Sequence, residues 1–174
     1  MTTSIDTAVT TQVYRVYIKA SPERIWQAIT DPAWTARYGY GGTVDYDLRP
    51  GGKYIAFTSE EMRATGAPDV AIDGEVLEAD PPRRLVQTWR MVMDPQMESE
   101  GFTKLTYDIA EGKGGVSRLT LTHELEGAPG LATLLSGGLE EMGAGGGWAW
   151  VLSDLKTLLE TGNGMDTEDA LNQG

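Results

Sequence analysis

The chain has 174 residues, of which 40% are hydrophobic and 23% charged, a composition typical of one globular domain with a sizeable core. Acidic residues outnumber basic ones 26 to 14, and the formal charge of −12 argues against nucleic acids and anionic membranes as partners. The absence of cysteine excludes disulfides, thiolate nucleophiles and thiolate metal sites. The sequence has neither a signal-peptide pattern nor 18 consecutive apolar residues, so we expect a cytoplasmic protein.

The N-terminal part is predicted to form a tail, a strand and two short helices. Residues 1–11 are rich in Thr, Ser and Asp and are predicted to be a flexible tail. Alternation of side chains from Val13 onward indicates a strand. Ser21 and Pro22 then suit the cap and first position of a short helix. Residues 33–38 are expected to form a second short helix.

Six further strands are predicted in the middle of the chain. Apolar residues mark each strand, and glycine- or proline-rich turns separate several of them. The polar segments 60–69 and 94–100 are expected to be loops. The predicted strands are residues 44–48, 53–58, 70–77, 84–93, 103–109 and 116–125.

The last predicted element is a long amphipathic helix. Apolar residues recur at helical spacing from Trp148 to Leu159, and Gly162 is expected to end the helix. A sheet with one apolar face must bury that face, and this helix is the only long amphipathic element, so we expect the sheet to wrap around it. Residues 12–162 therefore form one predicted domain, and residues 163–174 a second flexible tail.

Five segments resemble, in the expected order, the bacterial proteins similar to the activator of heat shock protein 90 ATPase. This family belongs to the START-like, or SRPBCC, superfamily, and the resemblance covers about residues 12–162. It implies an α+β helix-grip fold, as in the birch pollen allergen: a curved antiparallel sheet of about seven strands, with two short helices after strand 1, surrounds a long C-terminal helix and an apolar cavity. The segments are residues 19–26, 47–52, 75–89, 119–123 and 147–159.

Members of this family do not share one reaction. They include ligand carriers, co-chaperone domains, polyketide cyclases and self-resistance proteins against enediyne antibiotics. The leading hypothesis is therefore a binder that carries, sequesters or neutralises a hydrophobic, aromatic or polyketide-like small molecule. A self-sacrificing resistance protein cleaved at a glycine, a polyketide cyclase or dehydratase, and a co-chaperone-like interaction domain stay open as alternatives. No cofactor is expected, and we expect a monomer or a weak homodimer, with a protein partner as a further option.

Two segments depart from the family pattern, residues 37–42 and residues 142–147. Both are expected at the cavity mouth, so no ligand preference is carried over from the family.

Aromatic and methionine side chains are the leading candidates for ligand contacts. Aromatic rings with polar groups suit a flat, partly polar ligand, and methionine adapts to irregular shapes. Ordinary core packing is the alternative interpretation. The candidates are Tyr38, Tyr40, Tyr46, Tyr54, Trp89, Met91, Tyr107, His123, Met142 and Trp148.

His123 is the only histidine, and strand alternation places it with Leu119 and Leu121 on the inner face. It is a weak candidate for a general acid or base, and a hydrogen-bonded structural role is the alternative. One histidine without cysteine makes a metal site improbable. Asp45 and Asp47 share a face of a strand that is expected to point to solvent, so a catalytic carboxylate pair is not expected there.

Four glycines lie within residues 143–147. No strand precedes them and no Lys-Ser or Lys-Thr follows, which argues against a phosphate-binding loop. Glycine disfavours a helix by about 1 kcal/mol relative to alanine, so the long helix is predicted to begin at about Gly147. Such a glycine also offers a Cα hydrogen that a radical-generating ligand would abstract, as the resemblance to self-sacrificing proteins implies.

Overall fold

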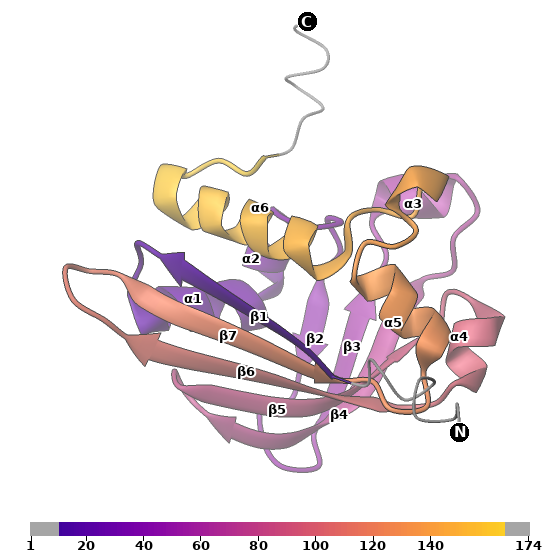
Figure 1. The fold of residues 1–174 in the computed structure, drawn as a ribbon, viewed down its shortest axis with the longest axis horizontal. Coiled ribbons are helices and arrows are strands. Elements are labelled where there is room, and N and C mark those ends of the chain that lie inside the picture. The colour runs from indigo at the N-terminus through magenta and orange to yellow at the C-terminus, as the bar shows by residue number, and fades with distance from the viewer. Residues whose placement is uncertain (1–10, 166–174) are drawn as a thin grey trace, which may run out of the picture.

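The structure, a computed structural model, describes residues 11–165 (Figure 1). Most of the two predicted tails therefore lies outside the described residues, although Thr11 already belongs to the first strand. As predicted, seven strands form one antiparallel sheet, in the order β1-β7-β6-β5-β4-β3-β2. The strands are β1 (Thr11–Ile18), β2 (Val44–Tyr46), β3 (Lys53–Phe57), β4 (Val70–Asp80), β5 (Arg84–Met91), β6 (Thr103–Glu111) and β7 (Ser117–Glu124).

The long last helix begins at Gly147 and ends before Gly162, so both of its predicted boundaries are confirmed. Gly162 stops the helix with a left-handed φ of 87°, a conformation that glycine adopts readily. The helices are α1 (Pro22–Thr30), α2 (Pro32–Thr35), α3 (Glu60–Ala64), α4 (Pro95–Ser99), α5 (Pro129–Leu135), the 3-10 helix η2 (Glu140–Met142) and α6 (Gly147–Thr161).

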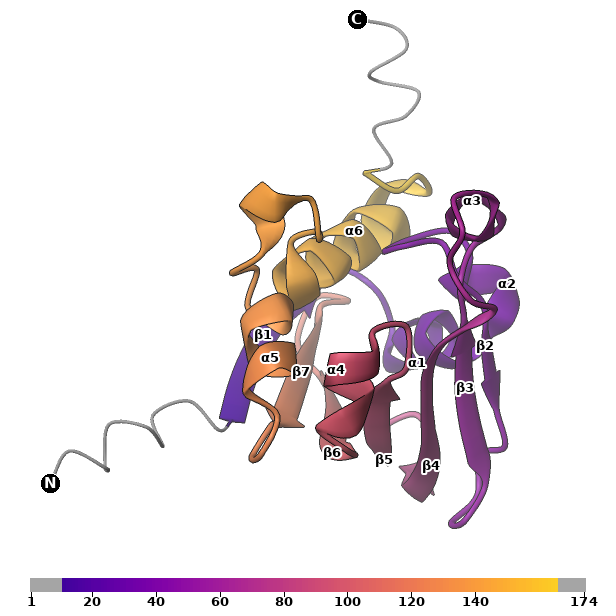
Figure 2. The same ribbon diagram turned by 90° about the vertical axis from the view of Figure 1, so that its right-hand side faces the viewer.

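The sheet is curved and holds α6 across its concave face, as Figures 1 and 2 show. Cross-strand neighbours in register, Leu85, Tyr107 and Leu121, point to this face from β5, β6 and β7. The face is covered by buried leucines of α6, such as Leu152 and Leu155. The helix-grip arrangement expected from the sequence is therefore confirmed.

The two short helices after β1 are capped by side chains that the sequence supplies. Ser21 Oγ accepts a hydrogen bond from the Arg24 N–H at 3.2 Å at the start of α1. Asp31 ends α1, and its Oδ1 accepts from the Ala33 N–H at 2.9 Å to start α2. Helix α2 is shorter than predicted, because it ends at Thr35 and not at residue 38.

Three further α-helices, α3, α4 and α5, and the 3-10 helix η2 were not predicted. The expected loops 60–69 and 94–100 contain α3 and α4, whose first N–H groups are bound by the side chains of Ser59 and Asp94. Helix α5 lacks a capping side chain of its own. Instead, Glu100 accepts hydrogen bonds from two N–H groups of its first turn at 2.8 and 3.0 Å.

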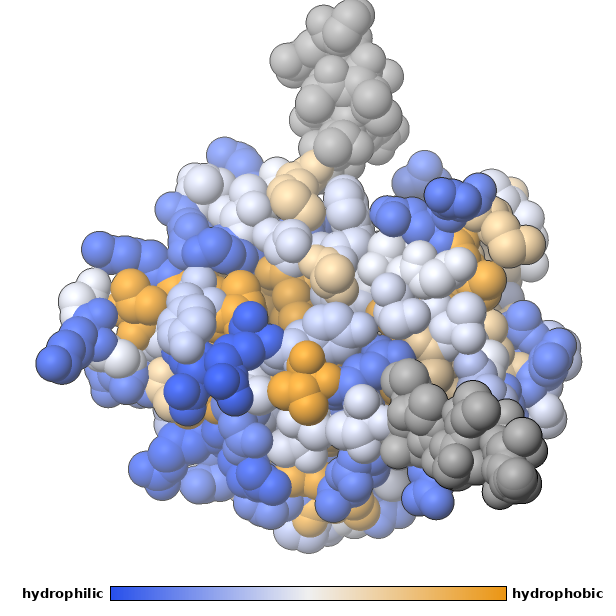
Figure 3. All heavy atoms as spheres, in the orientation of Figure 1, coloured by the Kyte–Doolittle hydropathy of each residue, from blue (hydrophilic) through white to orange (hydrophobic). Residues whose placement is uncertain are grey.

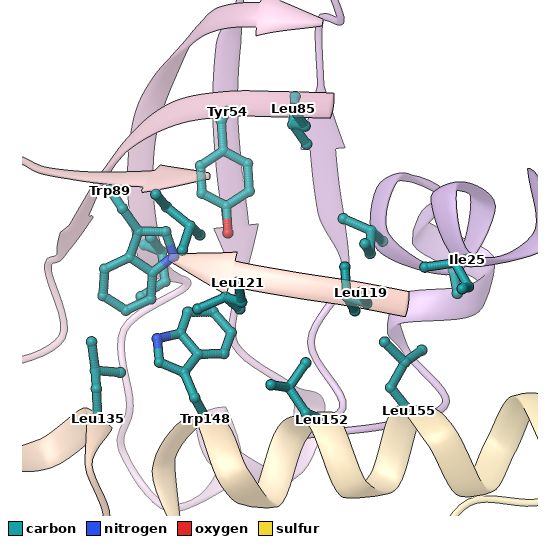
Figure 4. Packing of buried hydrophobic residues seen from close by; sticks show 14 of the residues in the cluster. Ile25, Tyr54, Leu85, Trp89, Leu119, Leu121, Leu135, Trp148, Leu152 and Leu155 are labelled. Carbon is teal, nitrogen blue, oxygen red and sulfur yellow. The ribbon is translucent and has the colours of Figure 1, made fainter. Parts of the chain in front are cut away.

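One end of the core, between α1 and the C-terminal half of α6, is filled with aliphatic side chains (Figure 4). Ile18, Ile25, Leu119 and Leu155 are at most 1% exposed. Each such burial stabilises the fold by about 1.5–3 kcal/mol. This end of the molecule therefore supplies much of its stability.

The outer surface in the view of Figure 3 is mainly hydrophilic, with hydrophobic groups scattered over it. Val13 and Tyr17 on β1 are the kind of isolated exposed hydrophobic residues that most proteins carry. Among residues 11–165, no helix is long and apolar enough to cross a membrane.

Candidate functional site

A largely apolar cavity of about 710 Å³ lies between the concave face of the sheet and the first turns of α6. This volume falls within the usual range of about 300–1,000 Å³ for small-molecule sites. Strands β2 to β6 form its floor, and the segments that carry α2 to α5 form its sides. Eight of the ten candidate ligand-contacting residues line it: Tyr38, Tyr40, Tyr46, Tyr54, Trp89, Met91, Tyr107 and Trp148.

The phenol groups of Tyr38, Tyr46 and Tyr54 in the cavity lining are held by the protein in different ways. The rings of Tyr46 and Tyr54 stack with their centres 4.6 Å apart. The Tyr46 hydroxyl donates a hydrogen bond to Gln87 Oε1 at 2.5 Å, and the Tyr38 hydroxyl donates to the Ala28 carbonyl at 2.8 Å. Burial raises the pKa of all three phenols above the ordinary value for tyrosine. They therefore stay protonated at neutral pH and act as hydrogen-bond donors.

His123 does not line the cavity but lies fully buried behind its wall. The Trp148 indole N–H donates to His123 Nδ1 at 3.1 Å, and the Nε2 lies 2.7 Å from Thr103 Oγ1. Thr103 Oγ1 in turn donates to the Trp89 carbonyl at 2.7 Å. Because Nδ1 accepts from an indole that can only donate, the proton of the neutral ring belongs on Nε2.

Both ring nitrogens of His123 are thus occupied, and burial lowers the pKa of His123 to about 3. The side chain has no free nitrogen to offer to a bound molecule. It acts as a polar clamp that fixes Trp148 at the start of α6 against Trp89 on β5. This geometry favours the structural interpretation of His123 over the general acid or base.

Met142 is the other candidate that lies outside the cavity. It is 80% exposed and lies on η2, none of whose three residues lines the cavity. Three other methionines that were not among the ten candidates do line the cavity: Met62, Met93 and Met97. Met62 and Met97 come from α3 and α4, the helices that were expected to be loops. An apolar methionine within each of these polar segments was the sequence signal that could have indicated their contact with the cavity.

A more polar hollow of about 620 Å³ adjoins the cavity, and Tyr38, Tyr40 and Gly145 line both. Tyr40 stands between the two, where its hydroxyl accepts a hydrogen bond from the Gly147 N–H at 3.2 Å. Residues of both segments that depart from the family pattern, 37–42 and 142–147, contribute to the lining of this hollow.

Asp154 of α6 lies beside this hollow and is only 2% exposed. Its carboxylate accepts hydrogen bonds from the N–H groups of Gly39 at 2.8 Å and Met165 at 2.5 Å. One buried carboxylate thus ties the loop after α2 and the segment after α6 to the long helix.

Gly147 is required by close packing at the cavity wall. Its φ is 71°, and a Cβ at this position would lie 2.1 Å from the Leu135 carbonyl oxygen. Only glycine avoids this overlap, so the chain can pass α5 and enter α6 beside the cavity. Gly145 is similarly restricted, because an added Cβ would lie 2.6 Å from the Tyr40 hydroxyl oxygen.

The titratable carboxylates of the cavity lining are Glu61 and Asp94, and no lysine, arginine or histidine belongs to that lining. Asp45 is exposed, and Asp47 forms an exposed ion pair with Arg49 at 2.8 Å, so neither faces the cavity. Within residues 11–165, no group of three or more His, Asp or Glu side chains is arranged to hold a metal ion. The arrangement is therefore suited to enclosing an apolar molecule and to hydrogen-bonding it through phenols.

Solved structures similar to this one share its fold at low sequence identity. CalU16 from Micromonospora echinospora is 23% identical with a TM-score of 0.61, and the match covers 92% of this chain and 72% of that one. DynU16, a protein of the dynemicin biosynthetic locus, is 21% identical with a TM-score of 0.62, covering 90% and 49%. PFC0360w, an HSP90 activator from Plasmodium falciparum, is 22% identical with a TM-score of 0.54, covering 95% and 97%.

No curated protein has significant sequence similarity to this chain. Residues 19–160, in contrast, match the family described as Activator of Hsp90 ATPase homolog 1-like protein. This match begins just after β1, runs into the last turn of α6 and includes every strand that forms the floor of the cavity. The chain belongs to the Activator of Hsp90 ATPase homolog 1-like protein family, within the SRPBCC superfamily.

Proposed function

We propose that this protein binds a hydrophobic, aromatic or polyketide-like small molecule in the cavity between the sheet and α6, in order to carry, sequester or neutralise it. The observation that carries the proposal is the 710 Å³ cavity with its apolar wall. Removing apolar surface from water contributes about 25 cal/mol for each Å² that is buried. A flat aromatic ligand that buries most of its surface in such a site gains the most binding free energy.

The residues of the wall fit this class of ligand. Tyr54, Trp89 and Trp148 present ring faces and edges, with the two indoles 6.0 Å apart. Aromatic side chains favour stacked and edge-to-face contacts with flat ligands. Met62 and Met91 add flexible thioethers that adapt to the outline of the bound molecule.

A self-sacrificing form of the same function is the second candidate. Gly143, Gly145 and Gly147 line the cavity, so their backbone is within reach of a bound molecule. A ligand radical that abstracts a Cα hydrogen atom becomes a C–H group and leaves a glycyl radical. Dioxygen then adds to this radical, the peroxyl radical takes a hydrogen atom from a thiol or a comparable reductant, and the resulting Cα hydroperoxide decomposes with cleavage of the chain at the glycine. The likeness to DynU16, from a locus that makes dynemicin, motivates this candidate.

The other two alternatives have less support. A cyclase or dehydratase that relies on His123 needs a free ring nitrogen in the cavity, whereas both nitrogens of His123 are engaged behind the wall. A co-chaperone role rests on the family and on the HSP90 activator PFC0360w alone.

A thermal-shift screen against hydrophobic natural products, followed by intact-mass analysis of each hit, tests the proposal. A ligand at a hundred times its Kd stabilises the native state by about 2.7 kcal/mol, which raises Tm by about 5–11 °C for a chain of this size. An unchanged protein mass then indicates a binder or carrier, and chain fragments that end at residues 143–147 indicate self-sacrifice.

A cavity-filling variant provides the matched control. Ala56→Trp places an indole in the cavity, because Ala56 lines it on β3, and should abolish the shift. Ala64→Trp on the exposed side of α3 adds the same group outside the cavity and should retain the shift. A ligand that shifts the Tm of Ala56→Trp as much as that of the wild type binds elsewhere and contradicts the proposal.

A further inference from the structure

The lining of the cavity carries four buried phenol groups, those of Tyr38, Tyr46, Tyr54 and Tyr107. A buried hydroxyl without a hydrogen-bond partner costs about 1–3 kcal/mol, so the partner of each one matters. These four hydroxyls are the polar groups that a molecule on the floor would meet first.

Three of the four hydroxyls have polar neighbours within the protein. Tyr38 and Tyr46 donate to the Ala28 carbonyl and to Gln87 Oε1. The Tyr54 hydroxyl points toward Trp89 in Figure 4, and the polar groups of Trp89, Gln87 and Tyr46 lower its pKa against the rise that burial causes.

Tyr107 has the least polar surroundings of the four. Among residues 11–165, its hydroxyl has no hydrogen-bond partner, and only burial and the nearby phenols of Tyr54 and Tyr38 act on its pKa, all of them raising it. Its direct cross-strand neighbours, Leu85 and Leu121, are apolar and fully buried. No fully enclosed side-chain nitrogen or oxygen in this part of the chain lacks a partner, so the Tyr107 oxygen must open onto the cavity.

The charges around the cavity add a second constraint. Its lining holds two carboxylates, Glu61 and Asp94, and no cationic side chain. An anionic ligand group would lose its hydration without gaining a counter-ion, which makes its burial expensive. A neutral oxygen acceptor has no such penalty and satisfies the proton of a phenol.

We propose that Tyr107 determines ligand specificity, by donating a hydrogen bond to a neutral carbonyl or comparable oxygen on the ring system of a flat apolar ligand. The class of ligand is thus an uncharged aromatic ketone or quinone, and not an aromatic carboxylate or a plain hydrocarbon. This inference rests on the proposed function, since it assigns the chemistry of the ligand in the same cavity.

Equilibrium dialysis with three matched tricyclic probes tests it: 9-fluorenone, fluorene, in which a CH₂ replaces the carbonyl, and 9-fluorenone-4-carboxylate. The measured quantity is the Kd of fluorene divided by the Kd of fluorenone. Because one neutral hydrogen bond is worth about 0.5–1.5 kcal/mol, this ratio should be about 2- to 12-fold larger in the wild type than in Tyr107→Phe. The carboxylate should bind more weakly than fluorenone.

Tyr17→Phe is the control, because Tyr17 is an exposed phenol on β1 that does not line the cavity, and it should keep the wild-type ratio. An independent readout is the infrared carbonyl band of bound fluorenone, which should move to lower frequency in the wild type but not in Tyr107→Phe.

An unchanged ratio together with an unchanged carbonyl band in Tyr107→Phe would overturn the inference while leaving the proposed function standing. Equal affinity for fluorenone and its carboxylate would overturn it as well. If neither neutral probe binds the wild type, the proposed function fails, and the inference fails with it.

Discussion

The two ends of the core are built from different kinds of side chain, although one sheet and one helix run through both. Toward α1, Ile25, Leu119 and Leu155 are almost completely buried and leave no large space between them. Toward α5, Tyr54 and Trp89 surround the 710 Å³ cavity, and Figure 4 shows both groups along α6. Branched aliphatic residues fill one end, whereas large aromatic rings enclose space at the other.

This difference separates stability from binding within one small domain. At the filled end, each methyl group has neighbours on all sides and contributes fully to the stability of the fold. At the cavity end, wall atoms lack partners on one side, and a bound molecule supplies those contacts. Substitutions at the two ends should therefore act on different properties.

The largest expected effect is a loss of stability at the filled end. Leu119→Ala should lower the free energy of unfolding by about 2–5 kcal/mol, because it removes a fully buried side chain and leaves a void. Met91→Ala on the cavity wall should cost about 1 kcal/mol, since its side chain borders existing space. Urea unfolding of both variants measures the difference, and equal losses would contradict the proposed division.

The next largest expected effect is a loss of stability when glycines are replaced where the chain enters α6. Gly147→Ala should destabilise the protein by about 3 kcal/mol, because the new Cβ overlaps the Leu135 carbonyl and φ is positive. Gly143→Ala also has a positive φ of 86°, but its Cβ meets nothing within 4 Å, so about 1 kcal/mol is expected. Similar melting temperatures for the two variants would show that the close packing at Gly147 is not required.

The third effect is a pH dependence of stability from the hydrogen bonds that join His123 to Trp148 of α6. The pKa of His123 is about 3 in the native state and about 6.5 in an unfolded chain. Between these values the unfolded chain binds a proton that the native state does not, so stability falls as pH falls, by about 1.4 kcal/mol for each pH unit. Above about pH 6.5 the contribution is constant.

Urea unfolding at pH 7, 5.5 and 4.5 measures this dependence in the wild type and in His123→Gln, which keeps polar atoms but cannot titrate. On acidification, the free energy of unfolding of the variant should fall by up to about 1.4 kcal/mol less for each pH unit than that of the wild type. Identical slopes in the two proteins would mean that native and unfolded chains bind the same proton, and hence that burial does not lower the pKa of His123.

The sequence predicted the fold well where local signals and the global pattern agree. Alternation located the seven strands, and the glycines at positions 147 and 162 marked both ends of α6. Short helices were missed because five residues give too few turns for an apolar period to appear. Ser59 and Asp94 are clear capping residues in retrospect, but such residues also occur in turns.

The site was predicted less completely, because it depends on contacts between residues far apart in the chain. Strand alternation correctly placed His123 on the inner face, yet its role depends on Trp148, which reaches it from α6. Met142 was expected at the cavity, but η2 carries it outward, and α3 and α4 bring Met62 and Met97 instead. Helix α5 depends on Glu100, about 30 residues earlier in the chain, for its first hydrogen bonds.

The methionine methyl groups test most directly whether a ligand binds in the cavity, because they report separately on the cavity and on the surface. In protein labelled with ¹³C at the methionine methyls, NMR spectra recorded during titration with 9-fluorenone follow each group. We expect large shifts for the four methionines that line the cavity and none for exposed Met142. The four cavity methionines are Met62, Met91, Met93 and Met97. Shifts at Met142 without shifts at the four cavity methionines, or no shift at any methionine, would contradict binding in the cavity.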